Sequence, residues 1–108
     1  MSAFIPKVSE ADLERLIARD FPSEHHETIR DTISRLEVRE KNRVVAACLK
    51  NANGNIERLN QDLADASGYW RELISEAEYP KVKKARNLSK EQIREKQREQ
   101  YLAWFSKK

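Results

Sequence analysis

The sequence has little glycine, proline and cysteine, with two, three and one residues of 108, respectively. A loop that cradles phosphates needs several glycines, so such a loop is hard to build here. The single cysteine, Cys48, excludes a disulfide bond within the chain and lies on an apolar helix face, as buried thiols often do. No apolar run reaches the roughly 20 residues that a membrane-spanning helix needs. The N-terminus also lacks an apolar run of the length found in signal peptides. We therefore expect a cytoplasmic protein.

Patterns of catalytic and metal-binding residues are also missing. There is no GxSxG turn, and the carboxylates are spaced as on solvated helix surfaces, with none in an apolar run where burial would raise its pKa. The two histidines, His25 and His26, are adjacent, whereas a helical zinc pair needs the spacing i, i+4. We expect no enzyme activity, no metal, no cofactor and no small-molecule substrate.

The residues that are present favour helices. Charged residues make up 36% of the chain and hydrophobic residues 39%, and no alternating run of β-branched residues is long enough to indicate a strand. The sequence predicts an all-α fold, a compact bundle of five or six short helices around one core. We assign residues 1–80 to this helical core domain, and residues 81–108 to a basic linker and an aromatic-tipped C-terminal helix.

Capping residues and helix breakers predict where the first helices begin and end. Ser9, with Asp12 three residues later, begins the first helix in a capping-box pattern. Pro22 ends that helix and Ser23 begins the second. The charged run at 37–42 interrupts the apolar stripe of the second helix, and we predict a break there rather than one long helix.

The stretch before Pro80 is expected to hold three further short helices. Asn53 and Gly54 end the first of them, because both accept left-handed backbone after a helix, and Asn55 caps the next. A second break is expected at residues 67–68. The apolar stripes together predict this core: Leu13, Leu16, Ile17, Phe21, Ile29, Ile33, Leu36, Val44, Val45, Cys48, Leu49, Ile56, Leu59, Leu63, Trp70, Leu73 and Ile74.

A glycine-asparagine turn, an apolar helix, a serine-containing turn and a third amphipathic helix follow one another over residues 54–74. The residues that carry the pattern are Gly54, Asn55, Ile56, Leu59, Leu63, Ser67, Trp70 and Leu73. The pattern resembles the helix-turn-helix of Fis-type and enhancer-binding transcription factors, which implies DNA reading by the third helix, where Arg71 is the only cation. The run from Leu49 to Pro80 with the aromatic C-terminus is also similar to short uncharacterised bacterial proteins, a likeness that implies no activity.

Charge is distributed unevenly along the chain. Residues 1–80 contain 11 Lys and Arg against 15 Asp and Glu, a net charge of −4. Residues 81–108 contain 10 Lys and Arg against three Glu, a net charge of +7. Ser89 and Gln92 form a capping box that begins the final helix after the basic linker. Such asymmetry indicates a tail that binds nucleic acid, an acidic partner or its own acidic body.

The aromatic end of this tail leaves three alternatives open, which are packing on the body, self-association, and anchoring another protein. Trp and Tyr are typical interface anchors, and the apolar face is too short to favour a membrane surface. Our leading hypothesis is a non-catalytic protein-interaction or adaptor module whose contact residues are Tyr101, Trp104 and Phe105. The alternative is nucleic-acid binding through a degenerate helix-turn-helix (54–79) or the basic tail (81–108). The cations for that alternative are Lys81, Lys83, Lys84, Arg86, Lys90 and Arg71.

Overall fold

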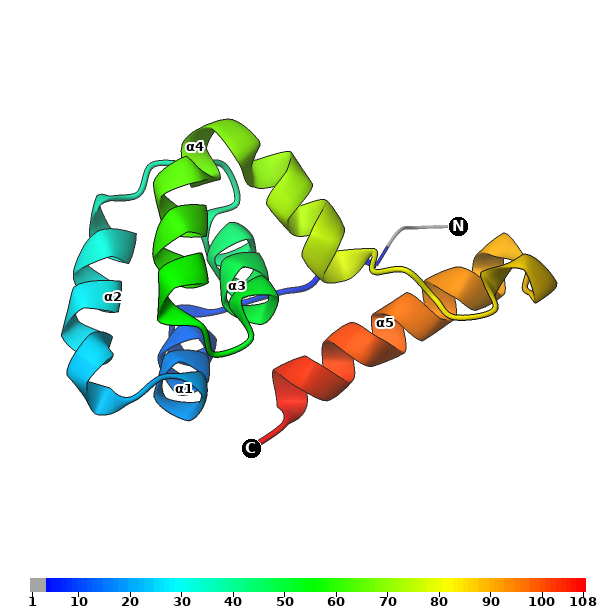
Figure 1. The fold of residues 1–108 in the computed structure, drawn as a ribbon, viewed down its shortest axis with the longest axis horizontal. Helices are drawn as coiled ribbons and strands as arrows, with labels where there is room; N and C mark the ends of the chain where they lie inside the picture. Colours follow the sequence, from blue (N-terminus) through cyan, green and yellow to red (C-terminus); the bar gives the residue numbers. More distant parts are fainter. Residues whose placement is uncertain (1–3) are drawn as a thin grey trace.

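The computed structural model describes residues 4–108; residues 1–3 of the predicted core domain lie outside the described residues (Figure 1). The described part of the chain is helical and contains no strand, which confirms the predicted all-α fold. The elements are α1 (Glu10–Asp20), α2 (Ser23–Arg35), α3 (Lys41–Ala52), α4 (Ile56–Glu78), a short 3₁₀ helix (Ala85–Asn87) and α5 (Lys90–Ser106).

Most of the predicted helix boundaries are confirmed. The Ser9 hydroxyl accepts from the Asp12 amide (3.0 Å) while the Asp12 carboxylate accepts from the Ser9 amide (2.9 Å), and this second bond lowers the pKa of Asp12. Ser89 and Gln92 form the same box at the start of α5. After α3, Asn53 and Gly54 adopt left-handed backbone, with φ of 48° and 83°. The predicted interruption at 37–42 is also found, since α2 ends at Arg35 and α3 begins at Lys41.

The predicted break at residues 67–68 is found directly after them, as a kink at Tyr69. Two helical segments meet there within α4, and Tyr69 is the residue whose backbone is not helical (φ −120°, ψ 23°). The Ser67 hydroxyl donates to the Glu37 carbonyl (3.3 Å) instead of capping a new helix, and Gly68 has no left-handed φ that would end the old one. The chain therefore bends within α4, whose two halves run in different directions in Figure 1.

The core is built around α3. Every residue from Val44 to Leu49 is fully buried, as expected of a helix that is covered on all sides. Thirteen of the 17 predicted core residues are buried, and the other four, Ile33, Leu36, Ile56 and Trp70, are partly buried against them. The predicted core did not include five alanines that are also buried, at positions 46, 47, 52, 66 and 77.

The buried thiol of Cys48 gives a testable expectation. Burial raises the pKa of Cys48 to about 12 from an ordinary value of 9.0, so at pH 8 its thiolate fraction is about a thousand-fold below that of an exposed cysteine. We expect a thiol reagent to label the native protein at least about a hundred-fold more slowly than the urea-denatured chain, since labelling then requires opening of the core. Comparable rates would contradict the burial of Cys48.

Candidate functional site

The aromatic end of α5 packs on the body of the protein, which we define as residues 4–80. Tyr101 is only 1% exposed, and its ring centroid lies 6.0 Å from Phe4, 5.5 Å from Trp104 and 6.0 Å from Phe105. Trp104 and Phe105 are partly buried against the core. The three side chains that were predicted to bind a partner are thus in contact with the chain's own body in this structure.

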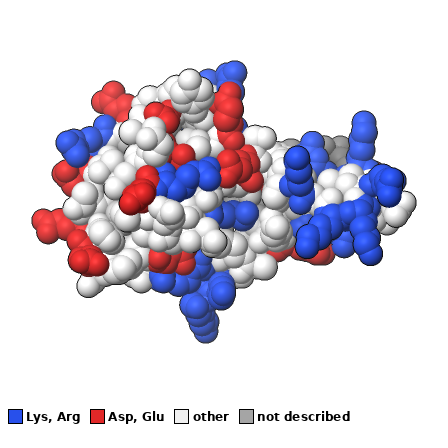
Figure 2. Space-filling model, viewed as in Figure 1, with Lys and Arg blue, Asp and Glu red and all other residues white. Residues whose placement is uncertain are grey.

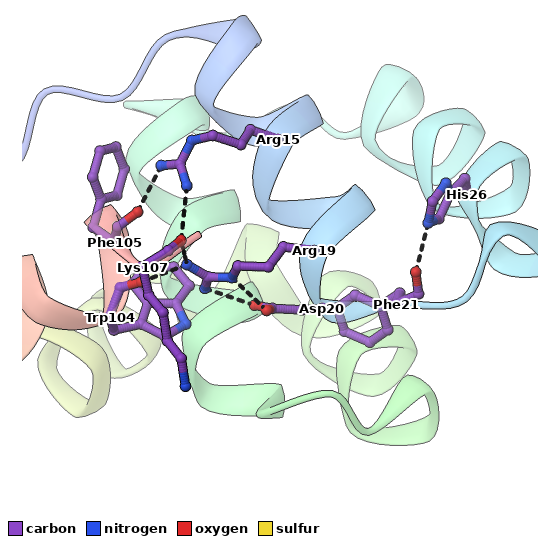
Figure 3. Close-up of polar contacts among 8 residues, drawn as sticks. All are labelled: Arg15, Arg19, Asp20, Phe21, His26, Trp104, Phe105 and Lys107. Atoms are coloured by element: carbon purple, nitrogen blue, oxygen red, sulfur yellow. Dashed lines mark hydrogen bonds and ion pairs between the residues drawn. The ribbon is translucent and has the colours of Figure 1, made fainter.

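Two arginines of α1 hold the C-terminal end of α5 (Figure 3). Arg19 donates to the carbonyls of Trp104 and Lys107, each at 2.6 Å. Arg15 donates to the carbonyl of Phe105 at 2.6 Å. Both guanidinium groups also lie over aromatic rings, Arg15 5.3 Å from the Phe105 centroid and Arg19 5.4 Å from that of Trp104. The last carbonyls of a helix lack partners within it and carry its negative dipole end, so these cations stabilise the docked helix.

The other side of Figure 3 shows one of the two adjacent histidines. The Nε2 atom of His26 lies 2.6 Å from the carbonyl oxygen of Phe21, so this ring ties the start of α2 to the turn before it. In the described part of the chain, no three His, Cys, Asp or Glu side chains are grouped so that they could hold a metal ion.

Two carboxylates are buried, which contradicts the surface placement expected for all of them. Glu78 is 4% exposed and Asp62 8%. Glu78 accepts two hydrogen bonds from Arg43, at 2.7 and 2.8 Å, and these bonds raise the pKa of Arg43 further above its ordinary value. Asp62 accepts from Arg58 at 2.8 Å. Both acids are positioned by tertiary pairing, and the only sequence signal was their place beside apolar residues of α4.

The basic segment, which we define as residues 81–98, differs from the body in how its cations are used. In the body, five arginines form ion pairs with carboxylates at 2.7 to 3.0 Å: Arg19, Arg30, Arg35, Arg43 and Arg58. In the basic segment, Arg98 alone has a carboxylate within 4.0 Å among residues 4–108, and that contact is at the limit. The remaining cations, including Lys81, Lys83, Lys84, Arg86 and Lys90, are exposed and unneutralised.

These charges gather at one end of the molecule. Figure 2 shows acidic side chains spread over the body, while blue side chains cluster at the right-hand end, where Figure 1 places the linker and the beginning of α5. Three cations of the basic segment stand on one face of α5, because Lys90, Arg94 and Arg98 follow one another at intervals of four residues. Neither Arg94 nor Arg98 was assigned to a site from the sequence, although their i, i+4 spacing was the available signal.

A groove of about 1000 Å³ lies beside this cationic face. Its other walls are the N-terminal segment, with Phe4 and Ile5, and the end of α4, with Tyr79. Arg94 lies over the Tyr79 ring, 4.9 Å from its centroid, and Arg98 over the Phe4 ring at 5.5 Å. The groove therefore combines flat aromatic surfaces with cations.

Arg71, the cation of the helix-turn-helix resemblance, lies elsewhere. It is exposed on the second half of α4 and sits 5.0 Å over the Trp70 ring. Its neighbour in sequence, Glu72, is exposed too, and Glu76 one turn on pairs with Arg58 at 2.8 Å. Arg71 thus lies on α4 and does not line the groove beside the basic segment.

Comparison of the chain with protein-family models, curated proteins and solved structures finds no match. Within residues 4–108, no helix is both long enough and apolar enough to span a membrane. The function must therefore be argued from the arrangement of these residues.

Proposed function

We propose that this protein is a non-catalytic nucleic-acid-binding protein that contacts phosphates through its basic segment. The observation that carries the proposal is the contrast in pairing, since five of the eight arginines of the body form ion pairs with carboxylates, whereas among the cations of residues 81–98 only Arg98 has a carboxylate within 4.0 Å. A cytoplasmic location, which the sequence predicts, would give the segment access to nucleic acid.

Electrostatics supports this use of the segment. Like charges four residues apart on a helix destabilise it by about 0.2–0.5 kcal/mol per pair, and Lys90, Arg94 and Arg98 form two such pairs. A polyanion bound along this face would relieve the repulsion, and it would release counterions from its own phosphates. The net charge of +7 on residues 81–108 would also attract nucleic acid before contact, and repulsion would orient the acidic body away from the phosphates.

The protein-interaction hypothesis is less well supported. It relied on Tyr101, Trp104 and Phe105 as free anchors, whereas Tyr101 is buried and the other two pack on the body. We propose instead that these aromatic residues fix α5 to the body and so hold the basic segment in place. Binding of an acidic protein by the same cations is the alternative that the experiments must distinguish.

The test is a salt titration of binding to a fluorescently labelled single strand of about 15 nucleotides. The variant replaces Lys81, Lys83, Arg86 and Lys90 by Gln. If these four residues contact phosphates of a single strand, the slope of log K against log salt becomes shallower by about 3. Between about 50 and 200 mM salt, the wild type should lose most of its affinity.

The matched control removes two exposed cations of the body, Arg39 and Arg71, by substitution with Gln. We expect this variant to bind like the wild type. Absence of wild-type binding at low salt would refute the proposal. Loss of binding in the control, with the basic-segment variant unaffected, would assign the interface to the surface around Arg39 or Arg71 instead.

A further inference from the structure

We infer that the groove beside α5 is a base-stacking site, so that the protein prefers single-stranded to duplex nucleic acid. The inference rests on the proposed function and adds to it the class of nucleic acid and the residues that recognise it. Phosphate contacts alone would not distinguish single strands from duplexes by their bases.

The first observation is the pair of cation–aromatic contacts in the groove. Arg94 over Tyr79 and Arg98 over Phe4 are one helical turn apart and use the same face of α5. Phe4 and Tyr79 are each only partly buried. Aromatic rings and planar guanidinium groups are the surfaces on which unpaired bases stack.

The second observation is the apolar surface of the groove. Ile5 is 57% exposed, and Ile93 faces the same space from α5. A groove of about 1000 Å³ is at the upper end of the usual size of ligand sites, roughly 300–1000 Å³, so it has room for bases as well as for phosphates. A duplex keeps its bases stacked inside and would leave these apolar surfaces in water.

The cations outside the groove favour nucleic acid over an acidic peptide as the occupant. The exposed linker cations, Lys81, Lys83, Lys84 and Arg86, belong to the same end of the molecule as the beginning of α5, which lines the groove (Figures 1 and 2), so an extended polyanion could contact both parts. An acidic peptide would satisfy the cations, yet it would gain little from the flat rings of Phe4 and Tyr79. Three acids, Glu78, Glu91 and Glu95, also line the groove, and they would repel carboxylates and phosphates alike, so within the groove the rings and not the charges distinguish the two occupants.

The experiment compares a single strand with a duplex of the same length, for the full chain and for Tyr79→Leu. Stacking contributes about 1–3 kcal/mol per base, or about 5- to 150-fold in affinity. We expect Tyr79→Leu to weaken single-strand binding within this range and to leave duplex binding unchanged. Tyr79→Phe, which keeps the ring, should retain single-strand affinity, and a circular dichroism melt checks that each variant is folded.

Tyr69→Leu is the matched control, because Tyr69 is 60% exposed on the same helix but does not line the groove. It should bind like the wild type. Equal binding of single strand and duplex, with no effect of Tyr79→Leu, would overturn the inference of a base-stacking site. If that binding still weakened with salt, the proposed function would stand. Failure to bind either nucleic acid, with binding of poly-glutamate, would overturn both and assign the groove to an acidic protein.

Discussion

Replacing Arg43 by alanine is expected to lower the free energy of unfolding by about 3–5 kcal/mol, the usual effect of removing one partner of a buried ion pair. Arg43 on α3 donates twice to Glu78 at the end of α4, and the Glu78 side chain is 1% exposed. Without the guanidinium, a negative charge would remain buried with no partner. Urea denaturation at pH 7 measures the loss.

Two comparisons separate burial from ion pairing in general. Arg30→Ala removes an ion pair of similar length, 2.8 Å to Glu14, in which both side chains are about half exposed; exposed pairs of this kind contribute less than about 1 kcal/mol. The double variant Arg43→Met, Glu78→Leu removes both charges and should recover much of the stability that Arg43→Ala loses. If Arg43→Ala and Arg30→Ala lowered the free energy of unfolding by equally small amounts, the Arg43–Glu78 pair would have to be hydrated.

Replacing Tyr101 by alanine is the second large change, and we expect it to free α5 from the body. Truncation of a large buried aromatic side chain costs about 3–5 kcal/mol, and Tyr101 is the one fully buried residue of α5. Three neighbouring rings, Phe4, Trp104 and Phe105, would lose their common contact. Far-UV circular dichroism and amide hydrogen exchange should show loss of α5 while the core around α3 persists.

Tyr101→Phe should have the opposite effect. The Tyr101 hydroxyl is buried and has no hydrogen-bond partner among the described residues, and an unsatisfied buried polar group costs about 1–3 kcal/mol. We therefore expect the variant to be at least as stable as the wild type at pH 8. A clear loss of stability at pH 8 would mean that the hydroxyl does have a partner in solution.

The pH dependence of Tyr101→Phe has a defined sign. Burial, with the negative charge of Glu78, raises the pKa of the Tyr101 phenol above its ordinary value of 10.0. Above pH 10 the unfolded phenol loses its proton while the folded one keeps it, so the contribution of Tyr101 to stability falls as pH rises. The stability advantage of the Phe variant over the wild type should therefore grow above pH 10, and a constant difference would contradict the pKa shift.

The fold was predictable from sequence where local interactions decide it. Ser9, Asn55 and Ser89 each satisfy amides of the turn that follows, and these bonds depend only on residues three positions apart. Apolar spacing found most of the core for a similar reason, since a helix presents one face whatever packs against it. The break near Ser67 and Gly68 was predicted, but the hydrogen bond that Ser67 donates to the distant Glu37 carbonyl was not, because it depends on the tertiary fold.

The candidate site was only partly predictable. Its cations were identified from the composition of the tail, but the groove was not, because Phe4, Tyr79 and Arg94 come from three parts of the chain. The role of the aromatic end depended on whether α1 offers it a binding surface. Arg15 and Arg19 provide that surface, and in the sequence they resemble ordinary exposed helix cations.

The attachment of α5 to α1 also has a consequence for the order of folding. The hydrogen bonds from Arg15 and Arg19 join residues 85 to 92 positions apart. Contacts that close so long a loop form late in folding, because the chain loses the entropy of loop closure before the contacts can stabilise it. The helices around α3 are closer in sequence and should assemble first. We expect α5 to dock last and to open first, so that its amides exchange with solvent faster than those of α3. While α5 is open, the body stays folded and the basic segment is no longer held against it.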